Sequence, residues 1–188
     1  MRDVRAQLAQ DHRFAHCVRV ARLADRLAQH HGEDARRARV AGLLHDLARL
    51  YDAARLLQAC EARGLPVGAF ERRNPVVLHA PLGAALARER FGVDDPAVLS
   101  AIAKHTLAAP DMSRLDLIVY LADGLEPGRD FPERPALEAL AFKDLTAAMQ
   151  VTLRASVAYL RARNLEAAPA TLAALRSFEA RERGLLPA

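Results

Sequence analysis

Apolar residues recur along the middle of the chain at the spacing of one helix face. Counted from Val40, they stand three, four, seven, eight and eleven positions later, at Leu43, Leu44, Leu47, Ala48 and Tyr51. This spacing predicts an amphipathic helix over residues 40–51. His45 and Asp46 fall on other sides of that helix, where their neighbours are the small residues Ala38, Ala41 and Gly42. Small neighbours predict that this second face is covered too, and a buried carboxylate then needs a partner.

The same periodicity, together with capping residues, places further helices along the chain. A helix is expected from Asp11 to about His31, and Gly32 ends it so that it packs antiparallel to the helix over 40–51. Pro81 predicts a break near His79, between a short helix that starts at residues 74–75 and a longer one that ends near residue 92. Residues 65–74 are expected to be irregular. The remaining helices are predicted over residues 52–64, 95–105, 113–125, 137–142, 144–163 and 171–183.

Composition favours a single all-α domain over residues 1–188. The chain is 52% hydrophobic with no Trp, so Leu, Ala and Val must form most of the core. The net charge is +4, and all but two of the 27 basic residues are Arg, which argues only weakly for an anionic partner. Cys17 and Cys60 form no Cys-x-x-Cys pair, which favours free thiols in a reducing compartment. Without a signal-peptide core or an apolar run of membrane length, the sequence predicts a cytoplasmic protein that binds neither membrane nor nucleic acid.

Titratable residues occupy several positions that the helical pattern buries or that lie at a helix break. They are His16, His45, Asp46, His79, His105 and Asp123. A shared metal would satisfy this set, because neutral imidazole and carboxylate are ligands for Fe, Mn, Zn or Ni. The lack of paired Cys argues against a structural zinc knuckle and against an iron–sulfur cluster. The alternative is a buried polar network without a metal.

The order of these residues resembles the H…HD…D pattern of the HD-domain superfamily of metal-dependent phosphohydrolases. Longer phrases resemble the bacterial YqeK family of symmetrical bis(5′-nucleosyl)-tetraphosphatases over nearly the whole chain. These phrases are Asn74-Pro-Val-Val-Leu-His79-Ala-Pro-Leu-Gly-Ala84, Ala103-Lys-His105-Thr106, Tyr120-Leu-Ala-Asp123, Glu126-Pro-x-Arg129 and Pro169-x-Thr171. The chain departs from the family after Thr106, where it reads Leu-Ala-Ala-Pro, and at Gly124, where the family has a bulkier residue. Both departures concern substrate contacts rather than the metal site.

The resemblance implies an HD-domain helical bundle that splits diadenosine tetraphosphate into two ADP. It implies a principal metal, with iron suggested by the family and Mn, Ni or Zn as alternatives, held by His16, His45, Asp46 and Asp123. Asp46, His79 and His105 would be catalytic, and the two histidines would either hold a second metal bridged by Asp46 or contact phosphate. Substrate contacts are expected from Arg13, Arg49, Lys104, Thr106, Arg129, Pro169 and Thr171. The C-terminal helical segment, from about residue 165 to residue 188, would pack near the nucleotide.

Two other interpretations remain open. The chain could be another HD phosphohydrolase, such as a nucleotidase or an alarmone hydrolase, although the phrases around His79 and His105 argue against this. It could instead be a non-catalytic module that senses a nucleotide, although such a module does not need a complete set of metal ligands. The sequence leaves open whether the protein is a homodimer.

Overall fold

The computed structural model describes residues 4, 6 and 10–183, and these residues form helices and connecting turns without a strand. The all-α class predicted from the sequence is therefore confirmed. The elements, in chain order, are α2 (Asp11–His30), α3 (Ala35–Leu44), α4 (Ala53–Glu61), α5 (Ala69–Arg73), the 3₁₀ helix η1 (Pro75–Leu78), α6 (His79–Phe91), α7 (Pro96–Lys104), α8 (Arg114–Leu125), α9 (Arg134–Lys143), α10 (Leu145–Ala162) and α11 (Pro169–Glu182). Among the described helices, none is long and apolar enough to cross a membrane.

Local capping explains why several helices begin where the sequence predicts. Asp52, Asp95 and Asp144 each accept a backbone N–H from the first turn of α4, α7 and α10 respectively. Ser113 forms a capping box with Asp116 at the start of α8. These side chains satisfy N–H groups that have no acceptor within the helix, so the helix starts are encoded locally.

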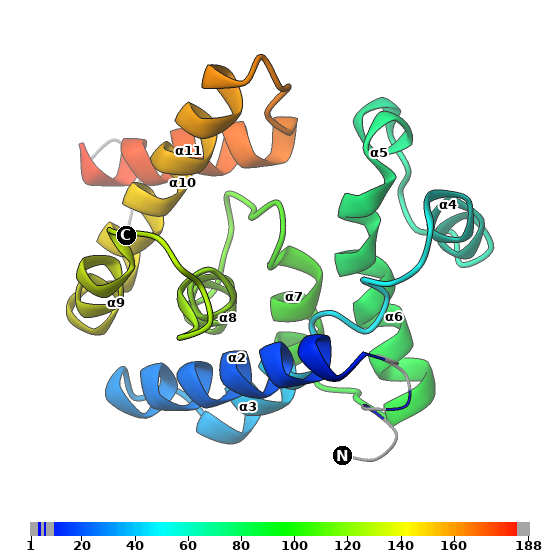
Figure 1. Cartoon of the computed structure of the whole chain (residues 1–188), viewed down its shortest axis with the longest axis horizontal. Helices are drawn as coiled ribbons and strands as arrows, with labels where there is room; N and C mark the ends of the chain where they lie inside the picture. Colours follow the sequence, from blue (N-terminus) through cyan, green and yellow to red (C-terminus); the bar gives the residue numbers. More distant parts are fainter. Residues whose placement is uncertain (1–3, 5, 7–9, 184–188) are drawn as a thin grey trace.

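Helix α8 lies inside the bundle, and α2, α3, α7 and α10 pack around it (Figure 1). Helices α2 and α3 pack so closely that a Cβ at Gly42 would stand only 2.9 Å from Ala21 Cα. Helix α6 packs on the far side of α7 from α8 (Figure 1). This packing brings the N-terminal half of α2 and the ends of α3, α7 and α8 to one place.

The predicted helix over residues 40–51 is wrong in its second half. Helix α3 ends at Leu44, and residues 45–50 form successive turns in which Arg49 N donates to Asp46 O at 2.9 Å. Turns closed by hydrogen bonds between residues three positions apart place successive side chains at nearly the spacing of a helix. Leu47 and Ala48 therefore remain buried, as the apolar pattern predicts. His45 and Asp46 therefore lie beyond a helix end rather than on its second face.

The segment between α4 and α6 contains more helix than predicted. Residues 69–73, which were expected to be irregular, form the short helix α5 after Gly68. The predicted break is confirmed, because η1 ends at Leu78 and α6 begins at His79. Pro81 is accommodated in the first turn of α6, where a backbone N–H has no helical acceptor in any case.

Candidate active site

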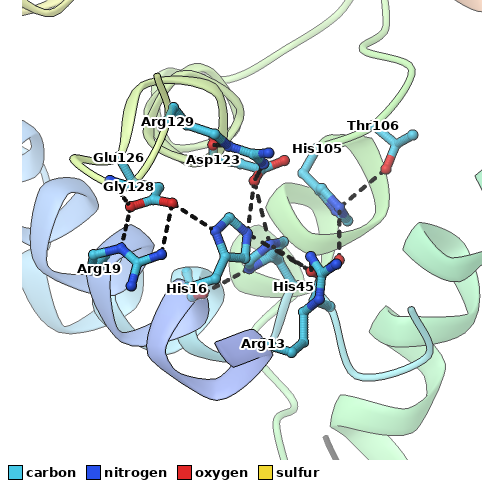
Figure 2. A network of polar contacts seen from close by, with 12 residues as sticks. Arg13, His16, Arg19, His45, His105, Thr106, Asp123, Glu126, Gly128 and Arg129 are labelled. Atoms are coloured by element: carbon cyan, nitrogen blue, oxygen red, sulfur yellow. Dashed lines mark hydrogen bonds and ion pairs between the residues drawn. The ribbon is translucent and has the colours of Figure 1, made fainter. Parts of the chain in front are cut away.

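Six titratable side chains predicted from the sequence converge between α2, α6, α7 and α8. Figure 2 shows His16, His45, His105 and Asp123 of this set. They come from segments far apart in the chain: His16 in α2, His45 and Asp46 after α3, His79 at the start of α6, His105 after α7 and Asp123 near the end of α8. Helix ends and the turns after them thus supply five of the six, which explains how side chains from so many elements reach one point.

One part of the site, which we call the Asp123 group, consists of His16, His45 and Asp123. Oδ1 of Asp123 lies 3.0 Å from His16 Nε2 and 3.7 Å from His45 Nε2. Oδ2 of Asp46 faces the same two nitrogens, at 3.8 Å from His16 Nε2 and 3.5 Å from His45 Nε2. Two imidazole nitrogens therefore face two carboxylate oxygens in a largely buried space.

The other part, which we call the His79 group, consists of His79, His105 and Thr106. Nε2 of His79 and Nε2 of His105 are 3.1 Å apart, and Thr106 Oγ1 lies 3.2 Å from the first and 3.1 Å from the second. Oδ1 of Asp46 is 3.4 Å from His79 Nε2 and 3.9 Å from His105 Nε2. Asp46 thus turns one oxygen towards each group and joins the two.

In each histidine, the partner of Nδ1 determines whether Nε2 has a lone pair available for a metal. Nδ1 of His45, His79 and His105 each bonds to the backbone carbonyl three residues earlier. A carbonyl can only accept, so we assign the hydrogen of each neutral ring to Nδ1, which leaves a lone pair on Nε2. His16 differs in that its Nδ1 lies 3.1 Å from Oε1 of Glu126. All four Nε2 atoms are consequently oriented as metal ligands are.

Glu126 is a buried carboxylate to which the sequence analysis gave no role. Besides His16, it binds Arg19 through Nε and through Nη2, the latter at 3.1 Å, and it accepts the backbone N–H of Gly128 at 2.6 Å (Figure 2). Burial raises the pKa of Glu126, but these donors outweigh burial and lower the pKa to about 2. A Cβ at Gly128 would stand 2.5 Å from Arg19 Nη2, so the loop leading to Arg129 is shaped around this ion pair.

Two arginines balance the charges of the aspartates. Arg13 Nη1 donates to Asp46 Oδ2 at 2.9 Å. Arg129 Nη2 donates to Asp123 Oδ1 at 2.7 Å, and its Nε donates to the backbone oxygen of the same residue at 3.0 Å. Burial raises the pKa of each aspartate, but the surrounding histidines outweigh it and the pKa of both is lowered. Both carboxylates are therefore ionised at neutral pH.

The histidines of the His79 group are held in the neutral form. Burial lowers the pKa of His79, and burial is the largest cause that lowers the pKa of His105 to about 3. At His16, burial acts in the same direction, but Asp123 and Glu126 outweigh it and the pKa is raised. Neutral imidazole beside ionised carboxylate is the protonation state that binding of a metal requires.

The residues of the site fit a metal ion. Nε2 of His16 and Nε2 of His45 are buried, and neither makes a hydrogen bond within the part of the chain that the structure describes. Ligand atoms held about 2.0–2.2 Å from a metal lie roughly 3–4 Å apart, which is the spacing found here. A set of imidazoles and carboxylates without thiolate suits Fe, Mn, Ni or Zn.

A cavity of about 400 Å³ opens over both groups. Four of the predicted substrate contacts line it, namely Arg13, Arg49, Thr106 and Arg129. Three guanidinium groups therefore stand beside the potential metal ligands, which makes this cavity suitable for an anionic ligand.

Residues 13–128 match the model of the HD domain. The chain belongs to the HD-domain family. It is 33% identical over 168 residues to the symmetrical bis(5′-nucleosyl)-tetraphosphatase of Bacillus subtilis, with 89% of each chain covered. A protein of the same name from Halalkalibacterium halodurans is 34% identical over 163 residues, with 87% of each chain covered. The predicted membership of the YqeK family is thereby confirmed, and the chain is an HD-domain phosphohydrolase.

A solved structure agrees with the helical HD fold. The crystal structure of a predicted HD superfamily hydrolase involved in NAD metabolism, from Clostridium acetobutylicum, matches this chain with a TM-score of 0.92. The two sequences are 32% identical, and 95% of each chain is covered.

Three predicted substrate contacts of this HD-domain protein, Lys104, Pro169 and Thr171, do not line the cavity. The ammonium of Lys104 lies 3.2 Å from the buried carboxylate of Asp116, whose charge it balances. Thr171 donates to the backbone oxygen of Leu107 at 2.8 Å, which ties α11 to the loop after α7. Pro169 is the first residue of α11.

Sequence reasoning also missed one side of the cavity. Its members carry no charge and come from three elements: Val76 and Val77 from η1, Tyr120 and Gly124 from α8, and Thr152 and Ser156 from α10. The first four lie in or beside phrases shared with the family, which was an available signal. Thr152 and Ser156 gave no local signal, because only the packing of α10 on α8 brings them to the cavity.

Proposed function

We propose that this HD-domain protein is a metal-dependent symmetrical bis(5′-nucleosyl)-tetraphosphatase, which hydrolyses diadenosine tetraphosphate and related dinucleoside polyphosphates to nucleoside diphosphates. The observation that carries the proposal is the position of Asp46, whose two oxygens face two histidine groups beneath a cavity lined by three arginines. Two relatives that bear this name are 33% and 34% identical to the chain. The free buried thiols of Cys17 and Cys60 support a reducing compartment such as the cytoplasm.

The arginines of the cavity suit a polyphosphate. Arg13 and Arg129 hold Asp46 and Asp123, so their guanidinium groups stand where the metal ligands meet the cavity. Arg49 lines the same space. Once a cation shares the charge of the two aspartates, the remaining N–H groups of Arg13 and Arg129 can donate to phosphate oxygens, for which a guanidinium is geometrically suited.

The family resemblance suggests iron as the cofactor, and the donor set is compatible with iron and equally with Mn, Ni or Zn. His16, His45, Asp46 and Asp123 would hold the principal metal. A divalent metal at this place supplies a Lewis acid that activates water and polarises a phosphoryl oxygen. The two aspartates among these ligands are ionised at neutral pH, as metal binding requires.

Of the two roles left open for His79 and His105, ligation of a second metal is favoured by their tautomers. Each ring uses its Nδ1–H to bond to a backbone carbonyl, so its neutral form can only accept at Nε2. Donation to phosphate would need protonated rings, whereas burial lowers the pKa of both. Thr106, whose hydroxyl lies at both Nε2 atoms, is the better phosphate donor in this group.

The position of bond cleavage follows from which phosphorus the site holds. Water adds to one inner phosphorus, and the bond from that phosphorus to the oxygen bridging it to the other inner phosphate breaks. The leaving group is then a nucleoside diphosphate, whose developing charge Arg13 and Arg129 are placed to stabilise. Attack at an outer phosphorus would instead release a nucleoside mono- and triphosphate.

Product analysis tests the proposal. Protein purified without oxygen, stripped of metal and reloaded, is incubated with diadenosine tetraphosphate, mononucleotides and alarmones, and early time points are separated by chromatography. ADP as the sole product from diadenosine tetraphosphate, dependent on added metal, is the expected result. AMP together with ATP, or turnover confined to mononucleotides or alarmones, would refute it.

A further inference from the structure

The loop between α7 and α8, residues 105–113, carries Thr106 of the site and then leaves the cavity. Thr106 Oγ1 lies near Nε2 of both His79 and His105, and Figure 2 shows its contact with His105. From there the loop runs in the direction of α10 and α11 (Figure 1). A threonine hydroxyl is separated from the backbone by the χ1 angle alone, so the loop backbone determines where this hydroxyl lies.

Ala108 holds this loop in a backbone conformation that alanine disfavours. Its φ is 61°, in the left-handed region, where a Cβ crowds the following carbonyl oxygen. The residue ends the turns that follow α7, and its N–H donates to Lys104 O at 3.0 Å. Glycine is the common residue at such a position, because it adopts this conformation without strain. The loop therefore needs contacts from other elements to keep its shape.

Helix α11 supplies such contacts through three side chains. Thr171 Oγ1 donates to Leu107 O at 2.8 Å, one residue before the left-handed position. Ser177 Oγ and Arg181 Nη2 donate to Pro110 O at 3.2 Å and 3.1 Å. Thr171 is only 7% exposed, whereas the other two bonds face solvent. Water can replace the exposed donors more easily than the buried one, so Thr171 is the main constraint on the loop.

Helix α11 is itself fixed to the part of the bundle that carries Asp123. Phe178 of α11 is buried, and its backbone oxygen accepts from Gln150 Nε2 of α10 at 2.8 Å. Helix α10 packs in turn on α8, which contains Asp123. The hydrogen bond of Thr171 therefore ties the loop after α7 to the same framework that positions the metal ligands.

We propose that Thr171 is a positioning residue for catalysis, which acts on Thr106 by holding the strained loop at Leu107 and Ala108. This inference rests on the proposed function. It gives Thr171 a part in the reaction although its side chain does not line the cavity. Without the hydrogen bond, the loop relaxes from the left-handed conformation, and the hydroxyl of Thr106 leaves the place from which it donates to phosphate.

Hydrolysis of diadenosine tetraphosphate by metal-loaded variants tests this role. Thr171→Val keeps the branched shape and removes the hydroxyl. It should lower kcat/KM by about tenfold, because displacing a group at a reacting centre by about 1 Å can cost about a hundredfold. Thr171→Ser keeps the donor and should restore most of the activity. Thr146→Val makes the same substitution at an exposed position of α10 outside the cavity and should match the wild type. The tightly held metal should stay bound in all three.

Two double variants separate positioning from a general loss of stability. Thr171→Val should have no further effect on kcat/KM in a Thr106→Val background, because the hydroxyl that it positions is already gone. Ala108→Gly removes the strain, so Thr171→Val should also cost little in that background. A purely structural role would instead make the losses multiply in the first double variant.

Ser177→Ala keeps the test decisive if Thr171→Val does not fold. It removes a solvent-facing bond to the same loop and should lower kcat/KM by a smaller factor, again without effect in a Thr106→Val background. Wild-type kcat/KM in Thr171→Val, or a loss that persists in both double variants, would overturn the assignment. If the wild type converts diadenosine tetraphosphate to ADP in that case, only the role of Thr171 is wrong; if it does not, the proposed function itself has failed.

Discussion

The two groups that share Asp46 differ in charge and in what their Nε2 atoms contact. The Asp123 group has a carboxylate of its own, and its two Nε2 atoms are buried without a hydrogen bond among the described residues. In the His79 group, the Nε2 atoms lie 3.1 Å from each other and both contact the hydroxyl of Thr106. Behind the rings, Glu126 supports His16, whereas the histidines of the His79 group rest on neutral carbonyls.

This contrast indicates that one site can contain two metal positions that differ in their affinity for the metal. A cation in the Asp123 group would face the carboxylates of Asp46 and Asp123, and Glu126 would add a negative charge behind His16. Both features strengthen binding of the cation. A cation in the His79 group would face one carboxylate, that of Asp46, and without a cation Thr106 can donate its hydroxyl hydrogen to one of the two Nε2 atoms. We therefore infer a tightly held metal in the first group and a weakly held one in the second.

Replacing Asp46 should have the largest effect, because it removes the residue that both groups share. Asp46→Ala is expected to lose bound metal and to lower kcat/KM by at least about a thousandfold, while the helices still form. Metal analysis, circular dichroism and turnover check this together. Asp116→Asn is the matched control, since Asp116 is a buried, ion-paired aspartate on α8 outside the cavity. A metal-free Asp46→Ala protein that still turns over substrate would disprove the assignment.

Single substitutions in the two groups should then separate them. His16→Ala is expected to lose the tightly held metal, whereas His105→Ala should keep it and lose about one equivalent of the weakly held metal per chain. Titration of each stripped variant with Fe²⁺ or Mn²⁺ distinguishes the two classes of binding. Equal metal affinities in both variants would abolish the distinction between the groups. Full metal content with reduced kcat/KM in His105→Ala would instead assign His105 to phosphate contact.

Glu126 should contribute a smaller part of the same difference. Glu126→Gln keeps an oxygen that can accept from His16 Nδ1 but removes the charge behind the ring. Metal affinity of the Asp123 group is expected to fall by about 10- to 100-fold, the usual effect of losing an outer partner of a metal ligand. Calorimetric titration of Glu126→Gln against Asp116→Asn measures it. Unchanged affinity in Glu126→Gln would reduce Glu126 to a partner of Arg19 alone.

The smallest expected effect is on the acid stability of the metal-free protein. The folded state holds the pKa of His105 at about 3, below the ordinary value of 6.5, so the unfolded state binds more protons between these values. The free energy of unfolding therefore falls as pH decreases from about 6.5 towards 3. His105→Asn should show a shallower fall of Tm over this window than the wild type. Parallel Tm curves for the two proteins would contradict the lowered pKa.

Helix starts were predictable because their signals are local. Asp52, Asp95, Ser113 and Asp144 cap the helices that follow them, and a cap needs only the next three residues. The end of α3 at Leu44 was not predictable, because turns of nearly helical spacing bury the same apolar residues. Periodicity cannot separate these two geometries.

The inner residues of the site were easier to predict than their partners. His16 and Asp123 stand at positions that the apolar pattern buries, which marks them as unusual within their own helices. Glu126 lies just beyond α8, and only the approach of Arg19 from α2 shows that it is buried and paired. Lys104 adjoins a motif histidine in sequence, but a buried carboxylate twelve residues later determines its position.

Anomalous diffraction from crystals of the metal-loaded protein, collected on both sides of the absorption edge of the metal, tests the central claim most directly. The account predicts a strong peak about 2.0–2.2 Å from ligand atoms of His16, His45, Asp46 and Asp123, with a weaker or absent peak between Asp46, His79 and His105. A strong peak at the second position alone, or no peak within reach of Asp46, would contradict it.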